Sequence, residues 1–183
     1  MSKIITFSKY FPSYHEKAGQ TTCFIQKILN QIGVDVDEKE YLDKLLSLNN
    51  ESLSNDKLVY TDIFLFWKTL TVRNIKTDKK HTIRAGKRFK AKELFSPRVW
   101  SKKPYNSPQI IFWDDVLIEK VISFEISEDR GRTFVYGDKQ VMPIQRSMIA
   151  MNDGLTLNDF DNWFKHPKPF SGQIICWDKD LDY

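Results

Sequence analysis

The patterns typical of α-helices and of β-strands occupy different parts of this sequence, and that separation limits its fold. Apolar residues recur at helical spacing in residues 24–32, before Gly33, and in residues 41–48, where Asp37 is a candidate N-cap. Strand-like stretches lie mostly later, at 3–11, 81–85, 92–100, 109–126, 132–142 and 171–178, with one more helix at 155–166. This order predicts an α+β domain around a small, mostly antiparallel β-barrel with flanking helices.

Two segments between the early helices and the strands carry weaker signals. Residues 49–57 are polar and predict a loop. Residues 59–72 are apolar enough for a buried strand or a short helix, and their periodicity fits both. With 183 residues, of which 41% are hydrophobic, the chain is predicted to form one domain over residues 1–183.

Positive charge is concentrated in one stretch. The segment from Lys68 to Lys103 holds thirteen Lys or Arg residues, and only Asp78 and Glu93 oppose them. The rest of the chain has more acidic than basic residues, although the whole chain carries a formal charge of +4. A near-neutral to acidic body with one basic segment is typical of a protein that contacts phosphates.

The cysteine and histidine residues predict neither a disulfide framework nor a metal site. Cys23 and Cys176 are far apart, and His15, His81 and His166 show no metal-ligand spacing. Glycine-rich cofactor-binding motifs are also absent, so no cofactor is predicted. The start of the chain lacks the apolar core of a signal peptide, and the longest apolar block is five residues. We expect a soluble, cytoplasmic protein without a membrane partner.

Four positions in the predicted strand at 81–85 and just before it form a recognisable pattern: Thr77, Lys79, Thr82 and Arg84. In this pattern and in its order of helices and strands, the chain resembles the ASCH domain family of PUA-like barrels. That family has the signature Gly-x-Lys-x-x-(Glu or Thr)-x-Arg, and Thr77 replaces its glycine. The resemblance covers most of the chain, with residues of about 33–68 as a helical insertion.

The resemblance implies a PUA-like barrel with a groove, between barrel and helices, that suits RNA or a nucleoside-like ligand. Some family members are amidohydrolases that act on N-acylated cytidines. The catalytic positions of those enzymes correspond to Lys79, Thr82 and, in place of a glutamate, Asp153. Other members are described as RNA-binding proteins or nucleases, so the family leaves the chemistry open.

The residues themselves allow two interpretations of this trio. Thr82 and Arg84 share one face of a strand, and Lys79 lies just before it. A desolvated Lys79 can act as a base on the Thr82 hydroxyl while Asp153 orients it. Alternatively, Thr82 is an ordinary strand residue among solvated cations. His81 points away from Thr82 and is predicted to have a structural or surface role.

The basic stretch also contains candidate contacts to RNA. We predict that cations bind phosphates, whereas Trp100 provides a surface on which a base stacks. The predicted phosphate-binding cations are Lys80, Arg84, Lys87, Arg88 and Arg98. The aromatic residues Phe89 and Phe95 are predicted to lie in the core. Tyr14, His15 and Lys17 are further candidates for the rim of a pocket.

Three functional hypotheses compete on these grounds. The favoured one is a module that binds RNA or a modified nucleoside or nucleotide in a basic groove. The second is an amidohydrolase for N-acylated cytidine-type nucleosides. The third is an interaction protein that uses the helix at 37–48 and the apolar residues 63–67 to bind a partner or its own copy. The oligomeric state is not predicted.

Overall fold

The computed structural model describes residues 2–36, 39–71, 75, 77–127, 133–137, 139–140, 143–165 and 169–181. The chain forms two compact units. Unit 1 contains Met1–Lys9, Thr22–Thr77 and Leu94–Val116, and unit 2 contains Tyr10–Thr21, Asp78–Glu93 and Leu117–Tyr183. The two-residue strand β5 (Val116–Leu117) lies where the chain passes from one unit to the other. Among the residues described, no helix is both long and apolar enough to span a bilayer.

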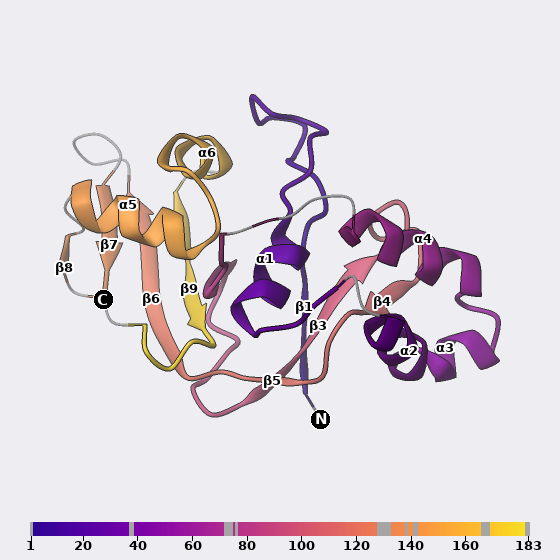
Figure 1. The fold of residues 1–183 in the computed structure, drawn as a ribbon. Coiled ribbons are helices and arrows are strands. Elements are labelled where there is room, and N and C mark those ends of the chain that lie inside the picture. The colour runs from indigo at the N-terminus through magenta and orange to yellow at the C-terminus, as the bar shows by residue number, and fades with distance from the viewer. Residues whose placement is uncertain are drawn as a thin grey trace. The chain divides into compact units, whose positions relative to one another are not determined.

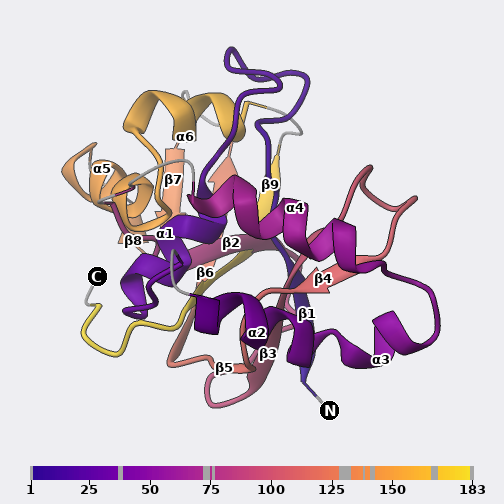
Figure 2. The ribbon, with the colours of Figure 1, turned by 45° about the vertical axis from the view of Figure 1, so that its right-hand side comes forward.

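In its described residues, unit 1 combines a small sheet with four helices (Figures 1 and 2). In the sheet, β1 (Lys3–Thr6) runs parallel to β3 (Leu94–Trp100), and β3 pairs with β4 (Gln109–Ile111) in antiparallel fashion. The helices are α1 (Phe24–Gln31), α2 (Lys39–Leu48), α3 (Asn50–Ser54) and α4 (Tyr60–Thr71). Buried rings of Phe7, Phe95 and Phe112 form part of the core.

The end of α1 follows from a local sequence signal. Gly33 has a φ of +75°, and its N–H donates to the Asn30 carbonyl, whereas the N–H of Val34 donates to the Leu29 carbonyl. This pair of hydrogen bonds is the Schellman motif, in which a glycine at C′ takes the left-handed conformation. The predicted stop at Gly33 is therefore confirmed, whereas the predicted N-cap Asp37 lies outside the described residues.

Two predictions about the middle of unit 1 are settled by buried side chains. Most of the predicted segment is a helix rather than a strand, since α4 spans Tyr60–Thr71 and buries Ile63, Phe66 and Leu70 at helical spacing. The predicted loop at 49–57 was wrong in part, since it contains α3. Asn49 is buried at the start of α3, where its side chain donates to the Ile111 carbonyl and accepts from the Ile111 N–H.

The exposed side of α4 is relevant to the hypothesis that the protein binds a partner or its own copy through these helices. Tyr60 and Leu65 are exposed on this helix. Of the apolar residues predicted to form one stripe on the helix at 37–48, Tyr41, Leu42 and Leu45 are buried, and Leu46 and Leu48 are half-buried. These exposures name no partner, so binding through these helices stays a prediction.

The described part of unit 2 contains an antiparallel sheet and two helices. Its strand order is β2 (His81–Ala85), β9 (Phe170–Cys176), β6 (Lys120–Ser127), β7 (Thr133–Tyr136) and β8 (Lys139–Gln140). Figure 1 shows α5 (Pro143–Asn152) crossing in front of β6 and β7, with α6 (Leu157–Trp163) nearby. The α6 side chain Phe160 and the following Phe164 pack against Phe124 of β6.

The α+β class is confirmed, and the barrel is not. Among the described residues both sheets are open, with unpaired ends rather than a closed ring of strands. The strand at 81–85, the last strand and the late helix are confirmed, and Thr156 is the N-cap of that helix, whereas helix α5 was missed. The organisation as one domain with an insertion at 33–68 stays a prediction.

Candidate functional site

Lys79 and Asp153 meet in the interior of unit 2. Lys79 is only 1% exposed, and its Nζ donates to the Asp153 carbonyl at 2.7 Å and to the Asp153 carboxylate. Asp153 follows α5, and its N–H donates to the carbonyl of Ile149 in that helix. The N–H of Lys80 donates to the Asn152 carbonyl and so joins the two segments. The structure thus brings together two members of the predicted trio, as a buried ion pair.

His81 completes this buried cluster. Its Nε2 lies 3.8 Å from the Asp153 carboxylate, and its side chain is fully buried. Burial and the positive charge of Lys79 hold the pKa of His81 well below 6.5, so the ring is neutral at physiological pH. Cys176 is the strand neighbour of His81, and burial raises the pKa of its thiol to about 12. His81 is buried, so the predicted alternative of a surface position was wrong.

Thr82 does not share the side of β2 that faces Asp153. Successive strand residues point to opposite faces, so Thr82 and Arg84 lie opposite His81. The face of His81 also carries Phe124, against which the α6 region packs. Lys79 and Asp153 therefore belong to the helix-covered face of the sheet, and Thr82 belongs to the other face. This separation gives the catalytic interpretation of the trio no geometric support.

The loop of residues 86–93, called the basic loop below, is anchored on the face that carries Thr82 and Arg84. The Gln173 side chain accepts a hydrogen bond from the Phe89 N–H and donates one to the Phe89 carbonyl, both at 3.0 Å. Gln173 is the strand partner of Arg84 in the register between β9 and β2. Phe89 itself is buried, as predicted, and so is Phe95 in unit 1. The two hydrogen bonds between Gln173 and Phe89, called the clamp below, and the buried Phe89 ring fix the middle of the basic loop.

The cations of the basic loop project into solvent around this anchor. Lys87, Arg88, Lys90 and Lys92 are all exposed. The guanidinium carbon of Arg88 lies 5.3 Å from the centre of the Phe89 ring. Lys92 forms an ion pair with Glu119, whereas no acidic side chain in the described part of the chain forms an ion pair with the ammonium of Lys87 or Lys90; the backbone N–H of Lys90 donates to the Glu93 carboxylate.

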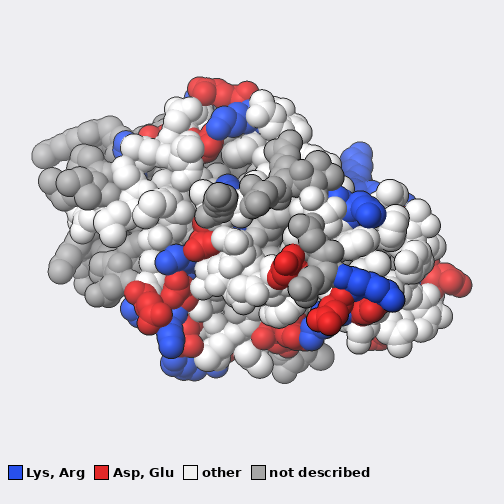
Figure 3. All heavy atoms as spheres, in the orientation of Figure 1, with Lys and Arg blue, Asp and Glu red and all other residues white. Residues whose placement is uncertain are grey.

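Many cations elsewhere lie next to acids. Lys80, one of the predicted RNA contacts, lies 3.2 Å from the Asp178 carboxylate, and Lys44 pairs with Asp114 in unit 1. Figure 3 shows the same mixture on the face that it presents, where blue and red side chains are largely interspersed. In the basic loop, Lys87 and Lys90 lack such an ion-pair partner among the described residues, whereas Lys92 has one in Glu119.

The predicted contacts Arg98 and Trp100 lie on β3, in unit 1. Arg98 is half-buried, and its Nε donates to the Ser96 hydroxyl at 3.2 Å. Trp100 is half-buried, with its ring centre 5.4 Å from that of Tyr105. The other predicted site residues, Lys79, Lys80, Thr82, Arg84, Lys87, Arg88 and Asp153, all belong to unit 2.

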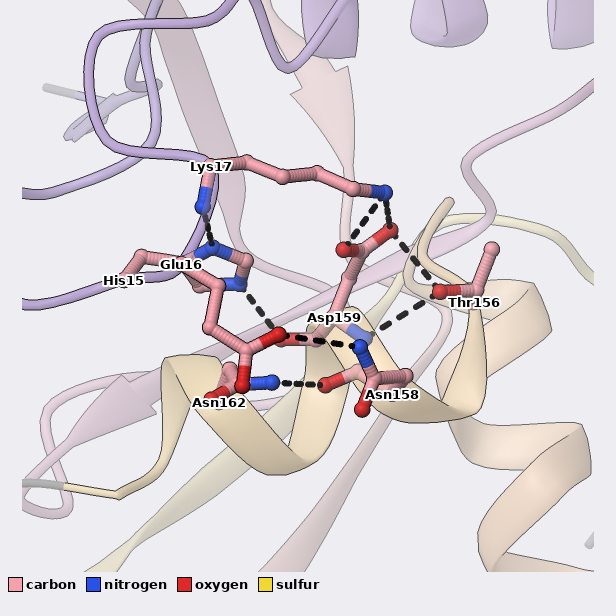
Figure 4. Close-up of polar contacts among 7 residues, drawn as sticks. All are labelled: His15, Glu16, Lys17, Thr156, Asn158, Asp159 and Asn162. Atoms are coloured by element: carbon pink, nitrogen blue, oxygen red, sulfur yellow. Dashed lines mark hydrogen bonds and ion pairs between the residues drawn. The ribbon is translucent and has the colours of Figure 1, made fainter.

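The candidate rim residues form a second polar cluster in unit 2 (Figure 4). The His15 Nδ1 accepts from the Lys17 N–H, so its Nε2 carries the proton and donates to the Asp159 carbonyl at 3.0 Å. Lys17 and Thr156 both donate to the Asp159 carboxylate. Tyr14 donates to the Trp163 carbonyl. These contacts fasten residues 10–21 to α6.

The charge of Asp159 is stabilised within this cluster. Burial alone would raise its pKa, but hydrogen bonds from Lys17 and Thr156 and the charge of Lys17 outweigh burial. The pKa of Asp159 is therefore held below its ordinary value of 3.8. Because the carboxylate and the imidazole bond to neighbouring groups, the cluster holds the loop against α6. A place of Tyr14, His15 and Lys17 at the rim of a pocket stays a prediction.

Comparisons with family models, with curated proteins and with solved structures found no match. The resemblance to the ASCH family therefore rests on Lys79, Thr82, Arg84 and the order of elements, and it stays a prediction.

Sequence reasoning missed Gln173, which positions the basic loop. One signal was present: Gln173 interrupts the apolar end of the last strand, directly before Ile174 and Ile175. A polar residue that is buried in such a strand needs hydrogen-bond partners. Those partners belong to a loop 84 positions earlier in the chain, which the sequence alone does not identify.

Proposed function

We propose that the protein binds RNA or a modified nucleoside or nucleotide through the basic loop. Arg84, Lys87, Arg88 and Lys90 would contact the phosphates, with the cytoplasm as the predicted location. The observation that carries the proposal is the clamp between Gln173 and Phe89, which fixes the loop while its cations face solvent. Resemblance to the ASCH signature supports the same class of ligand and extends the proposal to a PUA-like topology.

Fixed cations favour a phosphate ligand for two reasons. Each phosphate that they neutralise releases condensed counterions, which supplies most of the sequence-independent affinity for nucleic acids. A loop that is already held in place also loses less conformational entropy when it binds. The guanidinium of Arg88, placed against the Phe89 ring, adds a planar group that can bind a phosphate through two parallel hydrogen bonds.

Binding of a fluorescently labelled single-stranded 12-nucleotide RNA, followed by anisotropy, tests the proposal. The Lys87→Glu/Arg88→Glu variant should bind at least about tenfold more weakly, and its slope of log K against log salt should fall by about 1.4. Lys39→Glu/Lys57→Glu is the matched control, because it reverses two exposed lysines of unit 1 and changes the net charge equally. Equal losses in both variants, or no salt-dependent binding by the wild type, would contradict the proposal.

The amidohydrolase alternative receives less support. Its proposed base, Lys79, is buried and engaged with Asp153, and Thr82 lies on the other face of β2. This alternative would gain support if the wild type hydrolysed N-acylated cytidines and Lys79→Ala did not, at a temperature where that variant stays folded.

A further inference from the structure

The connection between β3 and β4 in unit 1 presents an aromatic ring to solvent. Tyr105, in this connection, is 87% exposed, the highest value among the large apolar and aromatic side chains in the described part of the chain. Its ring centre lies 5.4 Å from that of Trp100, at the end of β3, with the ring planes at 52°. Trp100 therefore supports Tyr105 from one side while most of the tyrosine surface contacts water.

The turn that holds Tyr105 is ordered by its own hydrogen bonds. The Ser101 N–H donates to the Pro108 carbonyl, and the Lys102 N–H donates to the Ser107 hydroxyl, which in turn donates to the Lys103 carbonyl. The Nζ of Lys9 donates to the Ser101 carbonyl from outside the turn. The ring is thus displayed on a fixed support, so stacking on it costs little ordering entropy.

Two lysines flank the exposed ring. Lys102 and Lys103 are both exposed, and Lys102 lies 3.0 Å from the Asp62 carboxylate in the first turn of α4. Lys103 has no acidic partner among the described residues. Figure 2 shows the connection between β3 and β4 projecting beside α4. The turn therefore combines a flat aromatic surface with nearby positive charge.

We infer that this turn is a binding surface for single-stranded nucleic acid. A base stacks on Tyr105, backed by Trp100, while Lys103 and Lys102 contact the flanking phosphates. Every base has a π-face, so this chemistry suits unpaired nucleotides without demanding a sequence. An anionic membrane fits less well, because Tyr105 is the one large apolar side chain at the tip and stable membrane anchoring needs more apolar area. The residues of this surface belong to unit 1, whereas those of the basic loop belong to unit 2.

Two substitutions of Tyr105 in the full chain, one that removes the ring and one that keeps it, test whether the ring stacks on a base. In the RNA anisotropy assay, Tyr105→Ala should weaken binding by about tenfold, because it removes the stacking surface. Tyr105→Phe should bind within about twofold of the wild type, since its ring still stacks. Because Tyr105 is exposed, both variants should keep the wild-type melting curve. Wild-type affinity in Tyr105→Ala, or equal weakening in both variants, would overturn the inference.

Photo-cross-linking identifies the contact directly. RNA that carries 5-iodouridine should cross-link to the peptide that contains Tyr105, and Lys103→Glu should lower the yield. Cross-links confined to other peptides would overturn the inference, as would binding to vesicles with 30% phosphatidylserine but not to RNA. The Lys87→Glu/Arg88→Glu variant separates the two proposals. If that variant binds RNA normally while Tyr105→Ala does not, the proposal for the basic loop is wrong and the inference about Tyr105 holds. If Tyr105→Ala binds normally while that variant does not, the inference about Tyr105 is wrong and the proposal for the basic loop holds.

Discussion

The two ends of the basic segment between Lys79 and Lys92 use their positive charge differently. At the first end Lys79 is buried and bound to Asp153, beside a neutral His81. At the other end, Lys87 and Lys90 are exposed on a loop whose backbone is clamped by Gln173. A dense run of cations in a sequence therefore mixes charges that hold the fold with charges available to a ligand, and only burial separates the two.

The buried end should be much more sensitive to substitution than the exposed end. Lys79→Met should lower the free energy of unfolding by about 3–5 kcal/mol, because it leaves the Asp153 carboxylate buried without its cation. Urea denaturation measures the loss, with Lys90→Met as the exposed control, for which we expect a change within about 0.5 kcal/mol. The double variant Lys79→Met/Asp153→Leu should recover much of the loss, since it buries no charge. Equal losses in the free energy of unfolding for Lys79→Met and Lys90→Met would contradict the difference between the buried and the exposed end.

The clamp that links the loop to the sheet should have the next largest effect. Gln173→Ala should cost about 1–3 kcal/mol, because the Phe89 N–H and carbonyl lose their partner in a buried position. Hydrogen exchange should also accelerate at the amides of residues 87–92. Gln20→Ala, at an exposed position, is the control. Unchanged exchange in the loop of Gln173→Ala would show that the clamp does not order it.

The pair between Lys17 and Asp159 is intermediate, since Lys17 is partly exposed and Asp159 is buried. The pKa of Asp159 is lower in the folded than in the unfolded state, so its charge stabilises the fold above pH 3.8. The stabilisation falls as pH drops from about 3.8 through the lower folded pKa. The free energy of unfolding of Asp159→Asn should therefore differ most from wild type near neutral pH and approach it at low pH, whereas Asp180→Asn should show little difference. A difference in the free energy of unfolding between wild type and Asp159→Asn that grows as the pH falls would contradict the lowered pKa of Asp159.

Local signals were sufficient for several elements of the fold. The strand at 81–85, the stop of α1 at Gly33 and the late helix α6 each depend on a few neighbouring residues, and all are confirmed. Helix α3 and the open sheets depend on distant partners instead. Asn49, for example, bonds to Ile111 across 62 positions, and a polar run that includes it looks like a loop.

The candidate site shows the same limit. The contact between Lys79 and Asp153 was expected only through a family resemblance, because 74 positions separate the two residues. Strand alternation does follow from the sequence and places Thr82 and Arg84 on one face. It could not show that Asp153 approaches the opposite face, because that depends on how α5 packs against the sheet.

Lysine acetylation with and without RNA, read by mass spectrometry, tests the central contrast most directly. We predict that Lys87 and Lys90 react readily in the unbound protein and are protected when single-stranded RNA is added, whereas Lys79 stays unmodified in both states while the protein is folded. Equal labelling of Lys87 and Lys90 with and without RNA, or rapid labelling of Lys79 in the folded protein, would contradict the account.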